Sequence, residues 1–494
     1  MTPDAALLLS LFAPLVGAIF CLWPRGRRFW AVAGIAAGLI GSSSLLFFTA
    51  DGSVHALASG SWRAPFGIVL VADALAAFLL VVCQLVVLAG ILLLSHPRYA
   101  GLRRRQALPL LLTLSLGASG AFLTGDLFNL YVWFEVLLLS SFALMSLVRG
   151  QGTGGEVWRY VIINLVSSLL FLAGAGLIYS KMGTLNFADL HLRLQESPQG
   201  FLVDSSAALL FGAFGIKAAL LPLAFWLPHS YPLLPGPIGG IFAGILTKVG
   251  LYAFYRVFGF VFAEDGSFPW QPLLLVLAIL TMLGGVLGAV AQGEMRRILT
   301  FHIISQVGYM ALALALFTPL ALAAGIYYLA HHIIVKANLF FAAGLVETRT
   351  GSSQLDQVRG LAVSAPVLAW LFALPALSLA GLPPLSGFFA KFSLLRSALE
   401  AGEILSAVAI VLVGLLTLFS MLKIWLAVFW GDPDPEAPAR SLGRLGPAAS
   451  LGLGLVTVSV GLLAGPLFEI AQRAAYNLLE PTAYLEAVLG PLVP

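Results

Sequence analysis

Fourteen long apolar runs occupy most of this 494-residue chain and restrict it to one class of fold. A helix needs about 20 consecutive apolar residues to cross the hydrocarbon core of a membrane. The links between the runs are short, so no separate soluble domain is expected. We therefore predict an all-α polytopic membrane protein with about 14 transmembrane helices, at residues 5–23, 30–49, 69–94, 107–124, 128–148, 158–180, 204–226, 237–262, 271–291, 298–317, 321–345, 363–395, 404–430 and 448–471.

Composition excludes the other broad classes of protein. Apolar residues make up 60% of the chain and charged residues 10%, whereas a soluble chain carries roughly 25% charged residues. So little polar surface rules out a cytosolic enzyme or a secreted domain, and disorder requires the opposite composition. The net charge of +4 comes from basic residues that are scattered along the chain, so no nucleic-acid partner is expected.

The sequence contains no visible site for a cofactor or a metal. Cys21 and Cys83 are its only cysteines, too few for an iron–sulfur cluster or a disulfide framework. It has no glycine-rich dinucleotide loop, no Walker loop and no zinc-binding H-E-x-x-H motif. We therefore expect no cofactor and no metal.

Basic residues sort unevenly between the two sides of the predicted membrane. Fifteen fall on one side, namely Arg25, Arg27, Arg28, Arg98, Arg103, Arg104, Arg105, Arg149, Arg159, Arg296, Arg297, Arg349, Arg359, Arg440 and Arg444. Five fall on the other, namely Arg63, Lys181, Arg193, Arg396 and Arg473. Cytoplasmic loops are enriched in arginine and lysine, so the first side is predicted to be cytoplasmic. An even number of spans then places both termini on the outer side of the cell membrane. Segment 181–203 is mixed polar and apolar and is predicted to lie along the membrane surface, in contact with lipids.

Lysine is concentrated inside the predicted spans. Five of the six lysines lie there, together with one arginine: Lys217, Lys248, Lys336, Lys391, Lys423 and Arg256. A charged residue inside a span is costly. Lysine, unlike arginine, can give up its proton when it is removed from water. A row of buried lysines therefore indicates a path for protons.

Three of these lysines are the strongest candidates. The alternative for each is snorkelling, in which a long side chain reaches the interface from a helix end. Lys217 and Lys248 lie deep in their spans, which disfavours snorkelling. Lys336 follows His332 by four residues, so the two side chains share one helix face. The three lysines and His332 are predicted to belong to the proton path.

The remaining basic candidates are weaker. Lys391 follows a broken segment, so its depth is open, while Lys423 and Arg256 lie nearer span ends, where snorkelling is favoured. His302 and His331 lie in or beside apolar spans. Histidine titrates near neutral pH and suits a proton relay, although a buried histidine more often only satisfies a backbone group. No carboxylate stands at metal-ligand spacing from these histidines.

Glu135 is the one carboxylate that is clearly deep, within the segment Asn129–Glu135. A single carboxylate in lipid is either neutral or paired, and Lys217 is the first choice of partner. Moving a proton onto Glu135 would release the lysine and pass charge along the row. The alternative is a static ion pair. Asp73 and Asp126 lie nearer span ends, where they can face water.

Two spans contain prolines that break a helix. The 204–226 span runs into Pro222, and the 363–395 span carries Pro383 and Pro384. Paired interrupted spans are typical of inverted-repeat transporters. We predict two inverted five-helix repeats with broken helices 7 and 12. The predicted units are N-terminal helices 1–3 (1–106), the first repeat (107–262), the second repeat (271–430), and helix 14 with its tail (448–494).

As a set, these segments resemble the antiporter-like subunits shared by respiratory complex I, membrane-bound hydrogenases and Mrp-type cation/proton antiporters. The matching segments are Thr124–Glu135, Phe214–Lys217 with Pro222, Leu246–Gly250, His332–Phe340 and Leu382–Phe392. Segment Gly183–Leu190 and the short tail after the last span are most similar to the D-subunit branch of the Mrp type. The resemblance implies proton transfer through Glu135, Lys217, Lys248 and Lys391, beside other membrane subunits.

Three functions follow as hypotheses. The first is a proton-translocating subunit of a multisubunit Na⁺/H⁺ antiporter, a secondary transporter and not an enzyme. The second is a proton-pumping subunit of a redox complex, with the same path but another energy source. The third is a structural scaffold with inert buried pairs.

Overall fold

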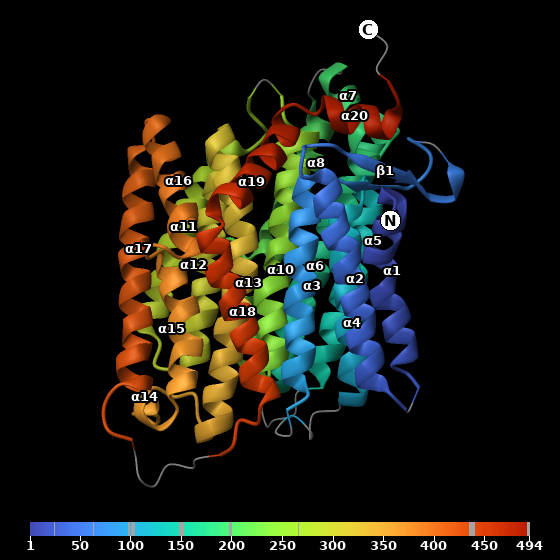
Figure 1. Cartoon of the computed structure of the whole chain (residues 1–494). Helices are drawn as coiled ribbons and strands as arrows, with labels where there is room; N and C mark the ends of the chain where they lie inside the picture. The colour runs from blue at the N-terminus through green and yellow to red at the C-terminus, as the bar shows by residue number, and fades with distance from the viewer. Residues whose placement is uncertain are drawn as a thin grey trace.

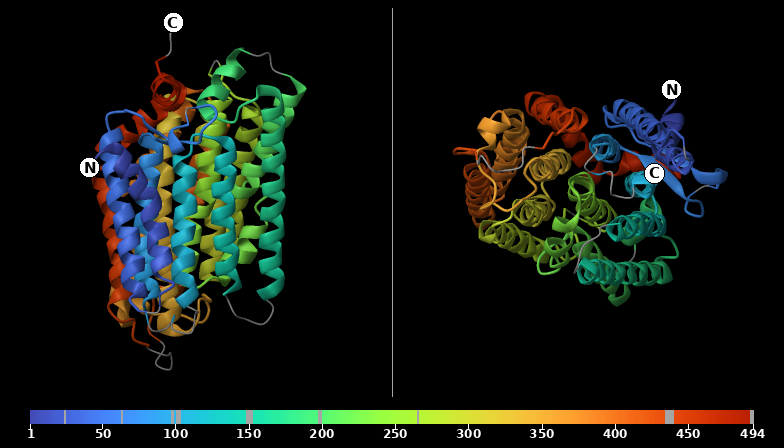
Figure 2. Two further views of the ribbon diagram at one scale, coloured as in Figure 1. Left: turned by 90° about the vertical axis from the view of Figure 1, so that its right-hand side faces the viewer. Right: turned by 90° about the horizontal axis from the view of Figure 1, so that it is seen from below.

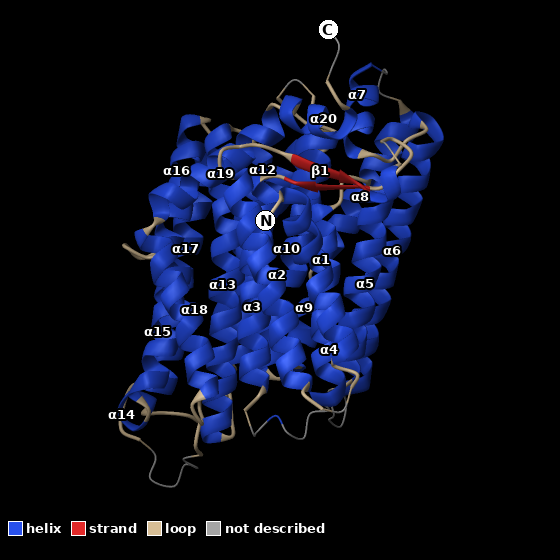
Figure 3. Cartoon of the chain, turned by 45° about the vertical axis from the view of Figure 1, so that its right-hand side comes forward, coloured by secondary structure: helices blue, strands red, loops and turns tan. Residues whose placement is uncertain are grey.

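The computed structural model describes residues 1–23, 25–62, 64–96, 99, 104–147, 153–196, 200–264, 266–433 and 440–491. The described part is an upright bundle of long helices with one pair of strands at its upper end (Figures 1 and 3). The strands β1 (His55–Ala58) and β2 (Val69–Ala72) pair antiparallel. This architecture confirms the predicted all-α membrane fold.

Most of the described residues lie in helices. The first half of the chain contains α1 Pro3–Phe20, α2 Arg27–Thr49, α3 Ala74–Leu94, α4 Arg104–Leu123, α5 Leu127–Ser146, α6 Thr153–Met182, α7 Phe187–Glu196, α8 Phe201–Ala218, α9 Trp226–Ser230 and α10 Gly236–Arg256. The second half contains α11 Gln271–Ala291, α12 Met295–Leu316, α13 Pro319–Thr350, α14 Leu361–Ser364, α15 Pro366–Ala380, α16 Ser386–Glu400, α17 Ile404–Ile424, α18 Leu445–Leu462, α19 Ala464–Leu479 and α20 Thr482–Leu489. Short 3₁₀ turns cover Ser59–Ser61 and Tyr231–Leu233, and π-helical turns extend α10 (Val257–Val261) and α17 (Trp425–Phe429).

The number of membrane crossings agrees with the prediction. Thirteen of the described helices are long and apolar enough to span a membrane. The short helices α15 and α16 meet at a break and together make one further crossing. Two predicted boundaries are wrong. Residues 69–72 of the run 69–94 form β2, and the run 448–471 divides at Leu463 into α18 and α19.

The C-terminal segment is also more ordered than the predicted tail. After α18 the chain forms α19, which carries polar residues on one side, and then α20. Both lie at the upper part of the bundle in Figure 1. Segment 181–203, predicted to lie along the surface, contains α7, which lies beside α20 at the same end.

Both predicted breaks are present, and each has a local cause. In the first, Ala219 adopts a left-handed φ of 64° directly after α8, and the chain then runs through Pro222 before α9 begins. In the second, Gly381 has φ 94° after α15, and α16 begins only after Pro384. Proline lacks the amide that a continuing helix needs, so neither helix can run through. The inverted-repeat relation between the two halves remains a prediction.

Three helices form the centre of the bundle. The most apolar stretches of α10 and α13 are completely buried inside the protein, and that of α12 almost completely. Seen from below, they lie between the N-terminal helices at one end and α15–α17 at the other (Figure 2). Polar side chains on these three helices face protein and not lipid, which is where irregular or charged groups are tolerated.

Capping explains where several helices begin. Asp73 Oδ1 accepts a hydrogen bond from Ala76 N (2.9 Å) at the start of α3, and Asp126 Oδ1 accepts one from Asn129 N (2.8 Å) at the start of α5. Side-chain acceptors at these positions satisfy amides that have no partner within the helix. Asp73 is fully buried, so the expectation that it faces water is wrong.

The two ends of the bundle differ in what they carry. The termini, the strand pair, α7 and α20 lie at the upper end, and α14 lies at the lower end (Figure 1). Both termini on one side is what an even number of crossings predicts. Arg63, Arg98, Arg103 and Arg149 of the predicted charge sorting lie outside the described residues. Which end faces the cytoplasm remains a prediction.

The tight crossing of α11 and α12 depends on Gly285. A Cβ atom at this position would overlap the backbone nitrogen of Ser305, a backbone contact that cannot relax locally. We expect Gly285→Leu to lower stability by about 1–3 kcal/mol or more, seen as a lower melting temperature of the purified protein. Gly176→Leu is the matched control, because Gly176 has open space around it on α6. Equal melting temperatures for the two variants would contradict this packing.

Candidate functional site

Lys217 lies in the last turn of α8, just before the first break. Trp226 Nε1 of α9 donates a hydrogen bond to the Ile216 carbonyl (3.1 Å), which holds the broken end against the helix. The buried Lys217 Nζ lies 3.4 Å from Ser168 Oγ of α6 and 4.9 Å from the centre of the Phe134 ring of α5. The ammonium is therefore surrounded by a hydroxyl and an aromatic face, which are weak partners for a full charge.

Glu135 follows Phe134 on α5, the residue whose ring lies against the Lys217 Nζ. Its Oε1 atom is buried and has no hydrogen-bond partner among the described protein atoms. The two side chains are both described, and no ion pair within 4.0 Å joins them. The sequence thus predicted the neighbourhood of the pair, while the predicted direct contact is absent.

Lys248 lies near the middle of α10 and is completely buried. Its Nζ donates a hydrogen bond to the Ala243 carbonyl of the same helix (2.6 Å). The end of α8 packs directly on α10 at Gly250, where a Cβ atom would lie 2.8 Å from the Lys217 carbonyl carbon. Lys217 and Lys248 are therefore carried by two helices in backbone contact.

Lys336 and His332 lie one turn apart on α13, and both are completely buried. Lys336 Nζ has no hydrogen-bond partner among the described protein atoms, and neither ring nitrogen of His332 has one. The helix that carries Lys248 packs directly on α13, where a Cβ atom at Gly244 would lie 3.0 Å from the Ile333 carbonyl oxygen. Buried polar atoms almost always have a partner, so three such atoms without a described protein partner set the Lys336–His332 cluster apart from an ordinary packed core.

His302 and His331 extend the cluster toward the second break. His302 Nε2 of α12 is 2.5 Å from Ser420 Oγ of α17, and His331 Nδ1 of α13 is 2.8 Å from Ser386 Oγ at the start of α16. The other ring nitrogen of each histidine is buried without a described protein partner. Each ring is thus held by one hydroxyl and has one nitrogen free to exchange a proton.

Lys391 closes the row at the second break. Its Nζ donates hydrogen bonds to the carbonyls of Leu379 (2.9 Å) and Ala380 (3.2 Å), the last residues of α15. It also lies 5.0 Å from the centre of the Tyr309 ring. The last carbonyls of a helix lack intrahelical partners and carry partial negative charge. The sequence left the depth of Lys391 open; the side chain is buried.

Lys423 occupies a similar position at the end of another helix. Its Nζ donates to the carbonyls of Val290 (3.0 Å) and Gln292 (2.7 Å) at the end of α11. The side chain is half-buried and binds a helix end, and the snorkelling interpretation of Lys423 remains a prediction. It lies one turn from Ser420, the partner of His302, on α17.

Together these residues form a row from α5 to α16 that contains four buried lysines, three histidines and one carboxylate: Glu135, Lys217, Lys248, Lys336, His332, His302, His331 and Lys391. An isolated buried charge is costly unless it is paired, hydrated or discharged. A row with one acid and several bases of which most lack a charged partner is therefore suited to gaining and losing protons. Among the described residues, no three His, Cys, Asp or Glu side chains are grouped so that they could hold a metal ion.

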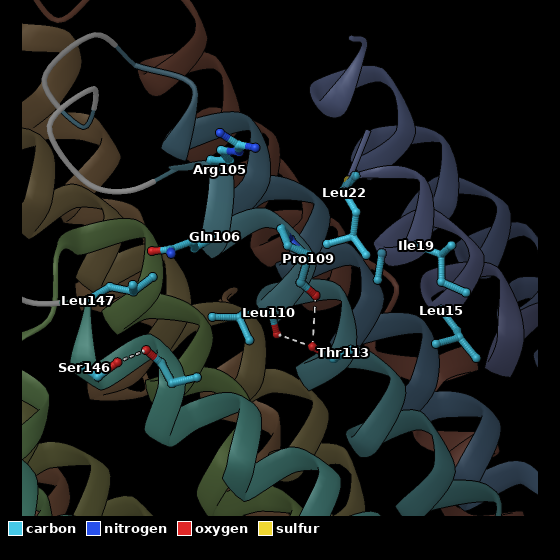
Figure 4. Close-up of a pocket in the computed structure, with 13 residues that line it drawn as sticks. Leu15, Ile19, Leu22, Arg105, Gln106, Pro109, Leu110, Thr113, Ser146 and Leu147 are labelled. Carbon is cyan, nitrogen blue, oxygen red and sulfur yellow. Dashed lines mark hydrogen bonds between the residues drawn. The ribbon is translucent and has the colours of Figure 1, made fainter. Parts of the chain in front are cut away.

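A lateral pocket of about 640 Å³ lies apart from this row, between α1, α4 and α5 (Figure 4). Leu15, Ile19 and Leu110 line it, with Arg105 and Gln106 toward one end. The hydroxyls of Thr113 and Ser146 are bonded to carbonyls of their own helices. No residue of the row lines this pocket.

Comparison with known proteins places this arrangement in a family. Residues 124–417 match the family described as NADH:quinone oxidoreductase/Mrp antiporter, TM. The D subunit of the Na⁺/H⁺ antiporter of Alkalihalophilus pseudofirmus is 44% identical over 439 residues, which cover 88% of each chain. This chain belongs to the NADH:quinone oxidoreductase/Mrp antiporter family. The resemblance seen in the sequence motifs is therefore confirmed.

Two solved structures match this chain over nearly the whole fold. A chain of the Mrp complex from a Dietzia species is 35% identical, with a TM-score of 0.92 and coverage of 99% of this chain and 100% of that chain. A chain of respiratory complex I from Thermus thermophilus is 28% identical, with a TM-score of 0.81 and coverage of 96% and 99%. Likeness is greater to the Mrp chain on both measures.

The sequence interpretation missed one buried ion pair in this family member. Arg256, for which snorkelling was favoured, binds Asp73 with an Nη2–Oδ2 distance of 2.7 Å, and both side chains are almost completely buried. Arg256 ends α10, which is buried along its length, so no route to the interface is open to it. The sequence did contain a signal for this burial: α10 carries several polar residues, and a membrane helix with many polar residues is usually enclosed by protein and not by lipid.

Proposed function

We propose that this chain is the proton-translocating subunit of a multisubunit Na⁺/H⁺ antiporter in the cell membrane. Protons move along the row of Glu135, Lys217, Lys248, Lys336, His332 and Lys391, with His302, His331 and Lys423 at its margin. The observation that carries the proposal is a completely buried Lys336 with no protein partner beside a His332 with none, on the central helices of a family member. An inert structural row would have its polar atoms paired.

The wider setting of the proposal comes from the relatives. The curated relative is named as a subunit of an antiporter, and the Dietzia chain comes from an Mrp complex; this chain is proposed to work likewise beside other membrane subunits. Its termini are proposed to lie outside. The described residues contain no acidic cluster suited to a hard cation, so the Na⁺ path is proposed to involve another subunit.

A second candidate is a proton-pumping subunit of a redox complex, which the likeness to the complex I chain supports. The proton path would be the same, and electron transfer would replace the ion gradient as the energy source. The greater likeness to the Mrp chain favours the antiporter. Purification from native membranes separates the two: antiporter subunits alone support the first, and iron–sulfur subunits in the same complex support the second.

Lys217 provides the direct test of proton transfer. Arginine keeps its proton almost unconditionally, so Lys217→Arg preserves the charge near Glu135 and removes the ability to release a proton. We expect both Lys217→Arg and Lys217→Ala to lower Na⁺/H⁺ antiport by about 100-fold, with unchanged assembly. Antiport is measured in vesicles with a pH-sensitive dye, and assembly by the yield of intact complex. Full activity of Lys217→Arg would mean that only the charge matters and would refute the proposal.

A further inference from the structure

The Asp73–Arg256 pair lies outside the proposed row, toward the upper end of the bundle. Arg256 Nη2 is 2.7 Å from Asp73 Oδ2, and the other carboxylate oxygen caps α3 through Ala76 N. The side chains are 2% and 0% exposed. Burying two charges carries a desolvation penalty that a good geometry only just offsets. A purely structural contact at this place could be made by apolar side chains.

A polar stripe on α10 runs from this pair toward the lysine row. Lys248, Tyr252 and Arg256 follow one another at intervals of four residues on α10, so they share one face of the helix. Arg256 Nε donates to Tyr252 Oη (3.2 Å), and Tyr252 Oη donates to the Phe122 carbonyl (2.6 Å). Eight residues of helix correspond to about 12 Å, which is the span from the central lysine to the ion pair.

Tyr484 of α20 covers the pair on its outer side. The ring centre lies 5.3 Å from the Arg256 guanidinium and 4.7 Å from the Phe260 ring. Tyr484 is buried and its hydroxyl has no described hydrogen-bond partner. A cavity of about 780 Å³ is lined by Ala483 of α20, by Asn477 and other residues of α19, by the start of α13 and by Asp51 and Gly52 after α2.

We propose that the Asp73–Arg256 pair under Tyr484 is the outer gate of the proton row; this inference rests on the proposed function above. Arg256 retains its charge, and a fixed positive charge in a narrow path repels protons and cations. A proton arriving at Asp73 binds a carboxylate oxygen, which dissolves the ion pair and frees the guanidinium to move. The same proton then leaves for water in the outer cavity, and the pair re-forms.

The gate is tested by measuring passive proton leak into vesicles that contain the intact complex, in the absence of Na⁺. Tyr484→Ala removes the ring that holds Arg256, and we expect the leak to rise about tenfold. Tyr484→Leu keeps an apolar side chain over the pair but lacks the ring. Its proton leak is expected to rise in the same way, so it replaces the alanine variant if that variant assembles poorly. The matched control is Tyr476→Ala on α19, a 63% exposed tyrosine that lines the same cavity and is expected to leave the leak unchanged.

Two further variants separate failure of the gate from failure of the row. Asp73→Asn retains a cap for α3 but cannot carry a proton, and it is expected to lower antiport about tenfold or more. Adding Lys217→Ala to Tyr484→Ala is expected to abolish the extra leak, because the protons pass along the row. A leak that is normal in both Tyr484 variants overturns the gate while leaving the row intact. A leak that survives Lys217→Ala also overturns it, because the gate would then not lie on the row.

Discussion

Replacing Glu135 with glutamine is expected to abolish antiport, lowering turnover by about 100-fold or more, while the complex still assembles in normal amounts. Glutamine has nearly the same shape and cannot take up a proton. Glu135 Oε1 has no hydrogen-bond partner among the described protein atoms, so the amide loses no contact that the carboxylate makes. The substitution removes the proposed first proton acceptor of the row.

The control for Glu135→Gln is Glu400→Gln. Glu400 is an exposed residue paired with Arg396 on the surface of α16, and such a pair contributes little to stability. Turnover of that variant should equal that of the unmodified complex. If Glu135→Gln reduces the yield of complex and the assembled fraction transports normally, the residue has a structural role, as the scaffold hypothesis predicts.

The sequence predicted the row because its members are polar residues in or beside long apolar runs. The lysines at positions 217, 248 and 336 each lie in a predicted membrane span without a charged residue nearby in the sequence. Placing a lysine there costs free energy, so its presence indicates a function. The four-residue spacing of His332 and Lys336 then places both on one face of a helix. These are local properties, and the structure places all four residues on buried surfaces.

Contacts between distant segments could not be obtained in this way. Asp73 and Arg256 are 183 residues apart, and the sequence shows each of them only as a charged residue near the end of a predicted span. Their pairing depends on how α3 and α10 pack, which periodicity does not encode. The same limit applies to Glu135 and Lys217, whose neighbourhood follows from chemistry but whose separation depends on side-chain packing around Phe134.

The hydrophobic pattern also did not predict where helices begin and end within the apolar runs. The run 69–94 is continuous, and a short apolar segment does not distinguish a strand from a helix. Asp73 caps α3 and fixes where that helix begins, and residues 69–72 form β2 because they pair with β1. The division at Leu463 does have a sequence signal that the prediction missed: Gly461 precedes it, and Gly465 and Pro466 follow it in the first turn of α19, where a proline is tolerated but a continuing helix is not.

Lys336→Met is expected to separate stability from function most clearly. Methionine matches the length of the lysine side chain and is apolar, so it fills the space between α10 and α13 without an uncompensated polar atom. Because Lys336 is completely buried and its Nζ has no described protein partner, we expect the variant to be more stable by about 1–3 kcal/mol. Antiport should fall by about 100-fold at the same time.

The opposite result is expected at Lys423, which makes the comparison decisive. Lys423 Nζ satisfies two carbonyls at the end of α11, so Lys423→Met leaves them without a partner and should lower the melting temperature of the complex. Methionine at position 336 should raise it. An unchanged rate of antiport in Lys336→Met would show that protons bypass α13, and a lower melting temperature would show that Lys336 has a partner that offsets the cost of its burial. A stabilised but inactive Lys336→Met complex would mean that the buried lysine lowers the stability of the folded protein and is retained because transport requires it, as expected of a residue that exchanges protons.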